Sequence, residues 1–145
     1  MGLPSVGPLL AVDWGERRFG LAVSDETQTL ARPFAVLPRR PGKRFPMPKF
    51  LQLVAEARPV GLVVGLPLTP EGTEGVAAAA ARELAGRLGA RTYLPVELVD
   101  ERMTTARAHA ELLESGQSSR GRYMDARAAA VLLQHFLEIR RNRTG

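Results

Sequence analysis

Short apolar runs bounded by glycine and proline alternate along this chain with stretches whose apolar residues recur at helical spacing. The short runs are typical of strands, and they predict strands at residues 9–12, 19–24, 34–37, 60–64 and 92–99. Apolar residues spaced by three and four positions predict helices at residues 50–57, 73–88, 104–115 and 125–141. The predicted element order is therefore β-β-β-α-β-α-β-α-α.

The connections between these elements predict a single α/β domain over residues 1–145. The first three strands follow one another through short turns, which favours antiparallel pairing. The later strands alternate with helices, which favours parallel pairing, so we expect a mixed central sheet flanked by helices. Residues 1–8 contain two prolines and two glycines and are expected to form a loose lead-in.

Composition narrows the chemistry that this domain can carry. The chain of 145 residues has no cysteine and two histidines, which excludes a thiolate zinc site and a cysteine nucleophile. Its 20 Lys and Arg residues outnumber 15 Asp and Glu residues, and arginine suits bidentate contacts with phosphate. Nucleic acid is the expected partner of such a chain. The alternative explanation for the many arginines is a general bias of the genome toward this residue. Without a membrane-length apolar segment or a secretion signal, we expect a cytoplasmic protein with no membrane partner.

Acidic residues occur where the predicted strands end and where the last predicted helix begins. Asp13 directly follows the apolar run at residues 9–12. Asp100 and Glu101 close the last predicted strand, and Asp125 opens the last predicted helix. If these strands run parallel, the carboxylates gather at one sheet edge, where a hard cation such as Mg²⁺ or Mn²⁺ relieves their repulsion. Two such ions about 4 Å apart are a common arrangement for displacement at a phosphodiester.

Each of these carboxylates also has a simpler explanation. An ion pair with one of the arginines that follow it would account for a buried Asp13. A salt bridge to Arg102 would account for the Asp100-Glu101 pair. The helix dipole alone favours an acid at Asp125. Their conjunction in a basic chain favours the metal site over the three separate explanations.

Four motifs in this chain closely resemble those of the YqgF family of Holliday-junction-resolvase-like proteins. They occur in the family's order and cover nearly the whole chain, from residue 9 to residue 137. The motifs are Asp13-x-Gly15-x-x-Arg18-x-Gly20-x-Ala22-x-Ser24-Asp25, then Gly65-Leu66-Pro67-Leu68 with Gly72-Thr73-Glu74-Gly75, then Asp100-Glu101-Arg102-Met103-Thr104-Thr105, and Asp125-x-x-Ala128-Ala129-x-x-Leu132-Leu133.

The resemblance implies an RNase H-like fold and a metal-dependent nuclease that matures the 5′ end of precursor 16S rRNA. It implies catalytic roles for Asp13, Asp125 and one or both of Asp100 and Glu101. The implied metal ligands are Asp13, Glu101 and Asp125, with two Mg²⁺ or Mn²⁺ ions as cofactor. We favour Glu101 over Asp100 because its longer side chain reaches further, while Asp100 holds the turn.

Four arginines lie next to the predicted acidic edge and are candidates for gripping substrate phosphates. They are Arg18, Arg102, Arg120 and Arg122. Surface solubility is the alternative explanation for each of them.

The expected partner is structured RNA, above all the ribosomal RNA precursor within a pre-ribosomal particle, with branched DNA as a second substrate class. A Holliday junction resolvase acting on four-way DNA in recombination or repair shares the metal chemistry, but it needs a stable symmetric dimer. We expect a monomer or a weak dimer. A third function, from a different class, is a ribosome assembly or transcription factor that binds nucleic acid without cutting it.

Overall fold

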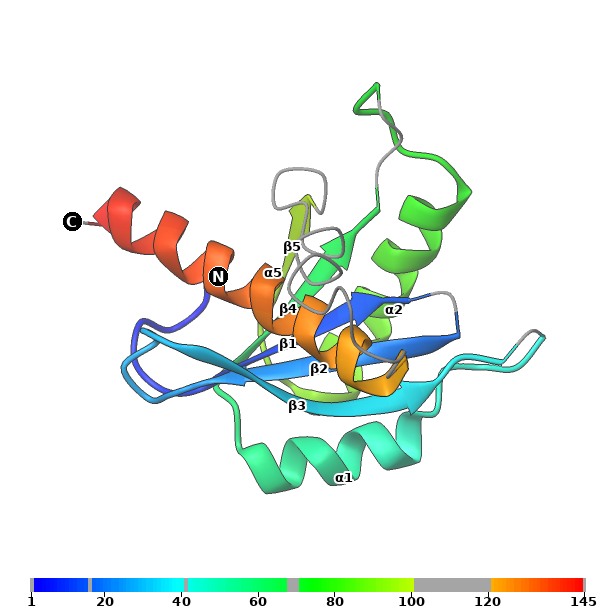
Figure 1. Cartoon of the computed structure of the whole chain (residues 1–145), viewed down its shortest axis with the longest axis horizontal. Coiled ribbons are helices and arrows are strands. Elements are labelled where there is room, and N and C mark those ends of the chain that lie inside the picture. The colour runs from blue at the N-terminus through cyan, green and yellow to red at the C-terminus, as the bar shows by residue number, and fades with distance from the viewer. Residues whose placement is uncertain (1, 16, 41, 68–70, 101–120, 145) are drawn as a thin grey trace.

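The computed structural model describes the backbone of residues 2–15, 17–40, 42–67, 71–100 and 121–144, with the side chains of all these except 121–125, 143 and 144 (Figure 1). Its centre is one five-stranded sheet. The strands are β1 (Leu9–Trp14), β2 (Arg18–Ser24), β3 (Ala31–Pro38), β4 (Gly61–Leu66) and β5 (Val96–Asp100). The described helices are α1 (Met47–Ala57), α2 (Val76–Thr92) and α5 (Gly121–Thr144).

The strand order across the sheet is β3-β2-β1-β4-β5. The first three strands pair antiparallel, and β4 and β5 run parallel to β1. This mixed sheet confirms the predicted arrangement of antiparallel followed by parallel strands. The predicted helix at residues 104–115 lies outside the described residues.

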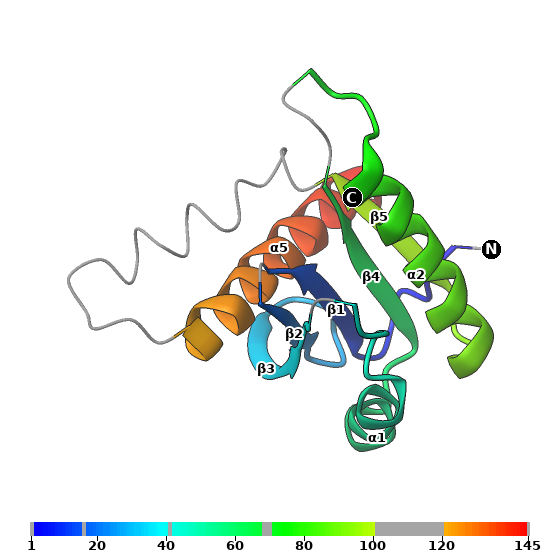
Figure 2. The same cartoon turned by 90° about the vertical axis from the view of Figure 1, so that its right-hand side faces the viewer.

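Helices cover both faces of the sheet (Figure 2). One face packs on α1 and α2 through a cluster that includes Leu10, Val12 and Phe50. The other face packs on α5 through a cluster that includes Leu9, Ala11 and Leu133. Because successive side chains of a strand point to opposite faces, β1 with its unbroken apolar run supplies both clusters.

The two shorter helices begin and end where local sequence requires it. α1 starts beside two prolines, which suit a first helical turn because they lack an N–H that would otherwise need a partner. It ends at Arg58, whose left-handed conformation lets its N–H donate to the Val54 carbonyl. α2 buries Leu84, Leu88 and small alanines, so this helix approaches the sheet closely.

In the described parts of the chain, no helix is long and apolar enough to cross a membrane.

The lead-in forms no helix or strand, yet hydrogen bonds hold it against the rest of the domain. The N–H of Gly7 donates to the Glu26 carbonyl over 2.7 Å. The side-chain amide of Gln28 donates to the carbonyls of Pro4 and Gly7, at 2.9 and 3.0 Å. The Arg140 guanidinium of α5 donates to Gln28 Oε1 at 2.7 Å. The segment predicted to be loose is therefore tied to both the β2–β3 turn and the last helix.

Gly7→Ala is expected to destabilise the fold by about 1–3 kcal/mol. Gly7 has a φ of +113°, which side chains rarely adopt, and an added Cβ would lie 2.5 Å from Val60 Cγ1. Urea unfolding measures the loss. Gly2→Ala is the matched control, because an added Cβ there meets nothing within 4 Å. Equal unfolding midpoints for the two variants would contradict the prediction.

Candidate active site

Asp13 lies near the carboxyl end of β1 and is fully buried, with 0% of its surface exposed. It shares a strand face with Leu9 and Ala11, both of which belong to the cluster packed on α5. Its carboxylate is therefore on the α5 side of the sheet. Burying a carboxylate costs several kcal/mol, so this position calls for compensating interactions from its surroundings.

A glycine lies level with this carboxylate on each of the two neighbouring strands. Gly20 of β2 is the direct partner of Asp13. On β4, Val64 is the partner of Val12, so the next residue, Gly65, is level with Asp13. Glycine inside a strand often marks a place where a ligand or another chain approaches the backbone. Across the three neighbouring strands, the acidic side chain of Asp13 therefore lies between two glycines, which have no side chain.

Asp100 reaches the same edge of the sheet but the opposite face. It pairs with Leu66, one step beyond the Gly65–Val99 pair, and it is half-buried. Leu98, two residues earlier on the same strand face, packs with the cluster on the α1 and α2 side. Asp13 faces α5. The structure therefore brings the two aspartates to one edge without placing them on one face.

Asp125 does not open the last helix, which corrects the prediction from sequence. α5 begins at Gly121, so Asp125 is its fifth residue and lies beyond the first turn. No acidic residue stands in that first turn, so capping and the helix dipole do not explain Asp125. The side chain of Asp125 and the whole of Glu101 lie outside the described residues.

Of the four predicted phosphate-binding arginines, the structure places the side chain of Arg18. It is half-buried at the start of β2, two residues before Gly20 and thus on the same sheet face as Asp13. Arg102 and Arg120 lie outside the described residues, as does the side chain of Arg122. Arg18 therefore lies on the same sheet face as Asp13 and at the same end of the sheet.

Two other residues of the first motif have structural roles at the far end of the sheet. Ser24 Oγ accepts a hydrogen bond of 2.9 Å from the N–H of Leu9. Asp25 accepts hydrogen bonds from the Thr27 hydroxyl and from the N–H groups of Thr29 and Leu30. These bonds, that of Thr27 first, lower the pKa of Asp25. The motif thus combines site residues near its start with turn-forming residues at its end.

A feature that the sequence reading left unassigned is a pocket of about 980 Å³ beside Trp14, on the sheet face opposite Asp13. Arg39 at the end of β3 holds this corner together. Its guanidinium lies 4.8 Å from the centre of the Trp14 ring and donates to the Gly15 carbonyl at 2.6 Å. The signal for this pocket in the sequence is the run of basic residues between Pro38 and Pro46.

The donor chemistry at Asp13 fits a hard divalent cation. Mg²⁺ and Mn²⁺ prefer carboxylate oxygens, and Asp13 supplies one buried carboxylate at the sheet edge. Among the described side chains, no group of three or more His, Cys, Asp or Glu residues is placed so that it could hold a metal ion. The other two predicted ligands, Glu101 and Asp125, are not among those side chains.

These elements define an RNase H-like α/β domain, and solved structures agree. The structure titled "T. thermophilus RuvC in complex with Holliday junction substrate" matches with a TM-score of 0.58 at 16% identity, covering 93% of this chain and 96% of that one. A second Thermus thermophilus RuvC structure matches with a TM-score of 0.55 at 15% identity and the same coverage. The predicted RNase H-like fold is confirmed.

The model of the family described as "RuvX: Holliday junction resolvase" matches residues 7–139. The chain belongs to this family, which confirms the resemblance carried by the motifs. A relative from Anaeromyxobacter dehalogenans is 41% identical over 90% of this chain and 96% of its own. A relative from Clavibacter michiganensis is 40% identical over 94% of this chain and 86% of its own. A relative from Chloroflexus aggregans is 38% identical over 92% of this chain and 95% of its own. All three are named "Putative pre-16S rRNA nuclease".

Proposed function

We propose that this protein is a metal-dependent nuclease of the cytoplasm that hydrolyses a phosphodiester bond in the maturation of the 5′ end of pre-16S rRNA. The observation that carries the proposal is the fully buried carboxylate of Asp13 between Gly20 and the level of Gly65. The names of its relatives, which are similar over nearly their whole length, supply the substrate. A basic chain with a formal net charge of +5 suits an RNA partner.

Asp13, Glu101 and Asp125 would hold the metal, as two Mg²⁺ or Mn²⁺ ions. When bound, such ions stabilise charge on the phosphoryl oxygens and lower the pKa of a water molecule. The chain's own residues position the substrate. Asp13 fixes the site at the sheet edge, and Arg18 on the same face neutralises a phosphate.

The face on which Asp100 lies supports Glu101 as the second carboxylate. Asp13 belongs to the α5 face, whereas Asp100 follows Leu98 on the opposite face. Side chains of a strand alternate between its two faces, so the face of Asp100 counts against Asp100 as the partner of Asp13 and leaves Glu101 as the acidic neighbour. This reason is independent of side-chain length, on which the sequence-based preference rested.

The two acidic neighbours therefore give different expected results on substitution. Glu101→Gln is expected to lower the rate of RNA cleavage about 10²-fold or more, as loss of one electrostatic contact to the reacting group does. Asp100→Asn is expected to lower it less than about tenfold. Single-turnover cleavage of a labelled RNA in Mn²⁺ measures both. A larger loss for Asp100→Asn than for Glu101→Gln would reverse the assignment.

The substrate is tested with two labelled molecules, a 16S rRNA precursor bearing its 5′ extension and a synthetic four-way DNA junction. We expect Mn²⁺ or Mg²⁺ to support cutting of the RNA and EDTA to stop it. The family description favours a Holliday junction resolvase as the second candidate. Symmetric cutting of the junction by a stable dimer would establish that activity instead, and tight binding without cutting of either substrate would indicate a non-cleaving assembly factor.

A further inference from the structure

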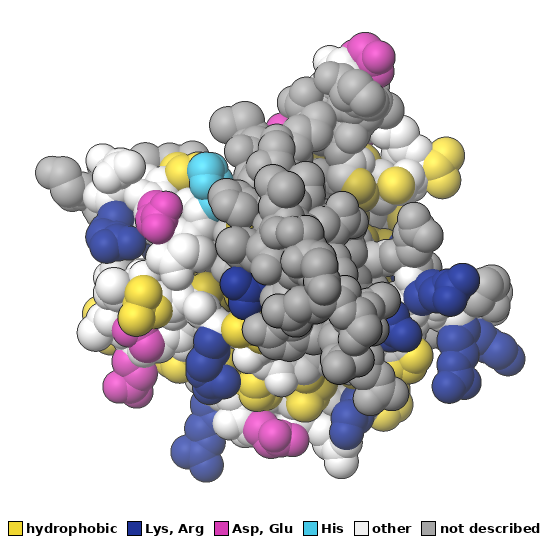
Figure 3. All heavy atoms as spheres, viewed as in Figure 1, with side chains coloured by type: hydrophobic (Ala, Val, Ile, Leu, Met, Phe, Trp, Pro, Cys, Tyr) yellow, Lys and Arg dark blue, Asp and Glu magenta, His cyan; other side chains and the backbone are white. Residues whose placement is uncertain are grey.

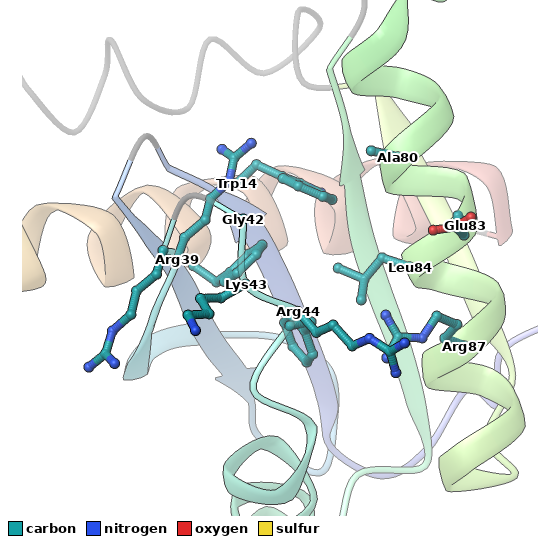
Figure 4. Close-up of a pocket in the computed structure, with 12 residues that line it drawn as sticks. Trp14, Arg39, Gly42, Lys43, Arg44, Ala80, Glu83, Leu84 and Arg87 are labelled. Atoms are coloured by element: carbon teal, nitrogen blue, oxygen red, sulfur yellow. The ribbon is translucent and has the colours of Figure 1, made fainter.

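The pocket beside Trp14 lies between the loop that joins β3 to α1 and helix α2, and its lining is strongly basic (Figure 4). Five of its lining residues are cationic and one, Glu83, is acidic. The cationic residues are Arg39, Arg40, Lys43, Arg44 and Arg87. Figure 3 shows Lys and Arg side chains gathering on the right-hand side of the molecule, near the place where this loop projects in Figure 1. An anion is the ligand that such a lining favours.

Two of these arginines reach into the pocket from opposite walls. Arg44 extends from the loop and Arg87 extends from α2, and the two guanidinium groups point toward one another (Figure 4). Like charges brought together in this way repel, and an anion between them turns the repulsion into two attractions. The guanidinium fork binds phosphate oxygens in pairs, so a phosphate group fits this place.

Three aromatic residues also belong to the lining of the pocket. Trp14, Phe19 and Phe45 all line it. The Trp14 and Phe19 rings meet edge to face at 5.2 Å, and Phe19 and Phe45 do so at 4.9 Å. Proteins that bind single-stranded nucleic acid combine basic grooves that follow the phosphates with aromatic rings that stack on bases. This pocket places basic side chains beside the partly exposed rings of Trp14 and Phe45, while Phe19 is buried next to them.

The pocket also adjoins the candidate active site. Trp14 directly follows Asp13, so these neighbours face opposite sides of β1 at the same end of the strand. A single strand that passes this sheet edge can therefore have a phosphodiester at Asp13 and its neighbouring nucleotides in the pocket. We propose that the pocket binds the single-stranded RNA flanking the cleaved bond, with a phosphate between Arg44 and Arg87. This inference rests on the proposed nuclease function.

The chain carries its own reporter for this test, because Trp14 is its single tryptophan and lines the pocket. A 12-nucleotide unstructured RNA is titrated into the protein in EDTA, with Trp14 fluorescence and the anisotropy of the labelled RNA recorded together. We expect saturable quenching of Trp14 with the same Kd as the anisotropy change. Binding without any change in Trp14 fluorescence would overturn the proposal.

The variant that tests the arginines is Arg44→Ala/Arg87→Ala. The logarithm of the association constant falls linearly with the logarithm of the salt concentration. Loss of two contacts to single-strand phosphates makes this slope shallower by about 1.4, which corresponds to binding about 25-fold weaker at 0.1 M salt. The matched control, Arg32→Ala/Arg58→Ala, removes the same charge from exposed positions near the start of β3 and just after α1, neither of which lines the pocket. It is expected to change Kd less than about fourfold.

Equal weakening in the two double variants would contradict a specific phosphate site and leave only general attraction between a basic protein and RNA. If uridine monophosphate quenches Trp14 with the same Kd as the RNA, the pocket is a mononucleotide site, which would also contradict the proposal. Because these titrations contain EDTA and need no cleavage, they are independent of the nuclease proposal. Failure of the pocket and failure of the nuclease therefore give different results.

Discussion

Replacing Asp13 with asparagine is expected to lower RNA cleavage about 10³-fold or more. Asp13 is the fully buried carboxylate around which the candidate active site is built. Charge stabilisation by a catalytic metal is worth several kcal/mol, and about 1.4 kcal/mol corresponds to a factor of ten in rate. Asparagine keeps the shape of the side chain but removes the charge that would hold a cation. Single-turnover cleavage of the labelled rRNA precursor in Mn²⁺ measures the loss.

Two companion measurements separate lost chemistry from lost structure. The thermal midpoint of Asp13→Asn shows whether the variant is folded, and its RNA affinity in EDTA shows whether the binding surface remains. Glu26→Gln is the control for charge, because Glu26 is exposed in the turn after β2, at the other end of the sheet. A folded Asp13→Asn protein that still cleaves at the wild-type rate would refute the nuclease site.

Phe50→Ala is expected to have the largest effect on stability, a loss of about 3–5 kcal/mol. Phe50 of α1 is fully buried, and its ring contacts Phe45 edge to face at 5.4 Å. Phe45 in turn contacts Phe19, so removing Phe50 leaves a cavity at the base of this row of rings. Domains of this size unfold with about 5–15 kcal/mol, so the loss is a large part of the total. Urea unfolding followed by circular dichroism measures it.

The matched comparison for this prediction is Phe50→Leu, which keeps most of the buried apolar volume and is expected to cost less than half as much. Lys49→Ala, at the exposed neighbouring position, is expected to change stability by less than about 0.5 kcal/mol. A cost of less than about 1 kcal/mol for Phe50→Ala would show that α1 is not firmly packed on the sheet.

The fold followed from the sequence because its signals were local and consistent. β1 begins with four consecutive apolar residues and β4 contains no polar residue, a pattern that marks strands covered on both faces. The third strand was harder. The sequence predicts this strand from Phe34, but in the structure it begins at Ala31 and includes Pro33. Pro33 fits there because the pairing of β3 with β2 shifts register between Leu21 and Ala22. An edge strand tolerates proline at such an irregularity.

The site was only partly readable from the sequence. Asp13 and Arg18 could be placed because the first strands and their turn are defined by local patterns. The face of Asp100 depends on the register of β5 against β4, which no local pattern specifies. The start of α5 before Asp125 was missed because apolar spacing becomes regular only from Ala126 onward. The Arg44 and Arg87 pair joins a loop to a helix far along the chain, so it required the tertiary structure.

The place of α5 in the chain has a consequence for how the protein is made. All five strands precede α5, yet the cluster around Leu9, Ala11 and Val63 is covered by this last helix. During synthesis that sheet face, on which Asp13 lies, therefore stays open until α5 has left the ribosome. A nascent chain lacking α5 has an apolar sheet face that is open to aggregation or to a chaperone. Formation of the candidate active site is thus delayed until α5 has been synthesised.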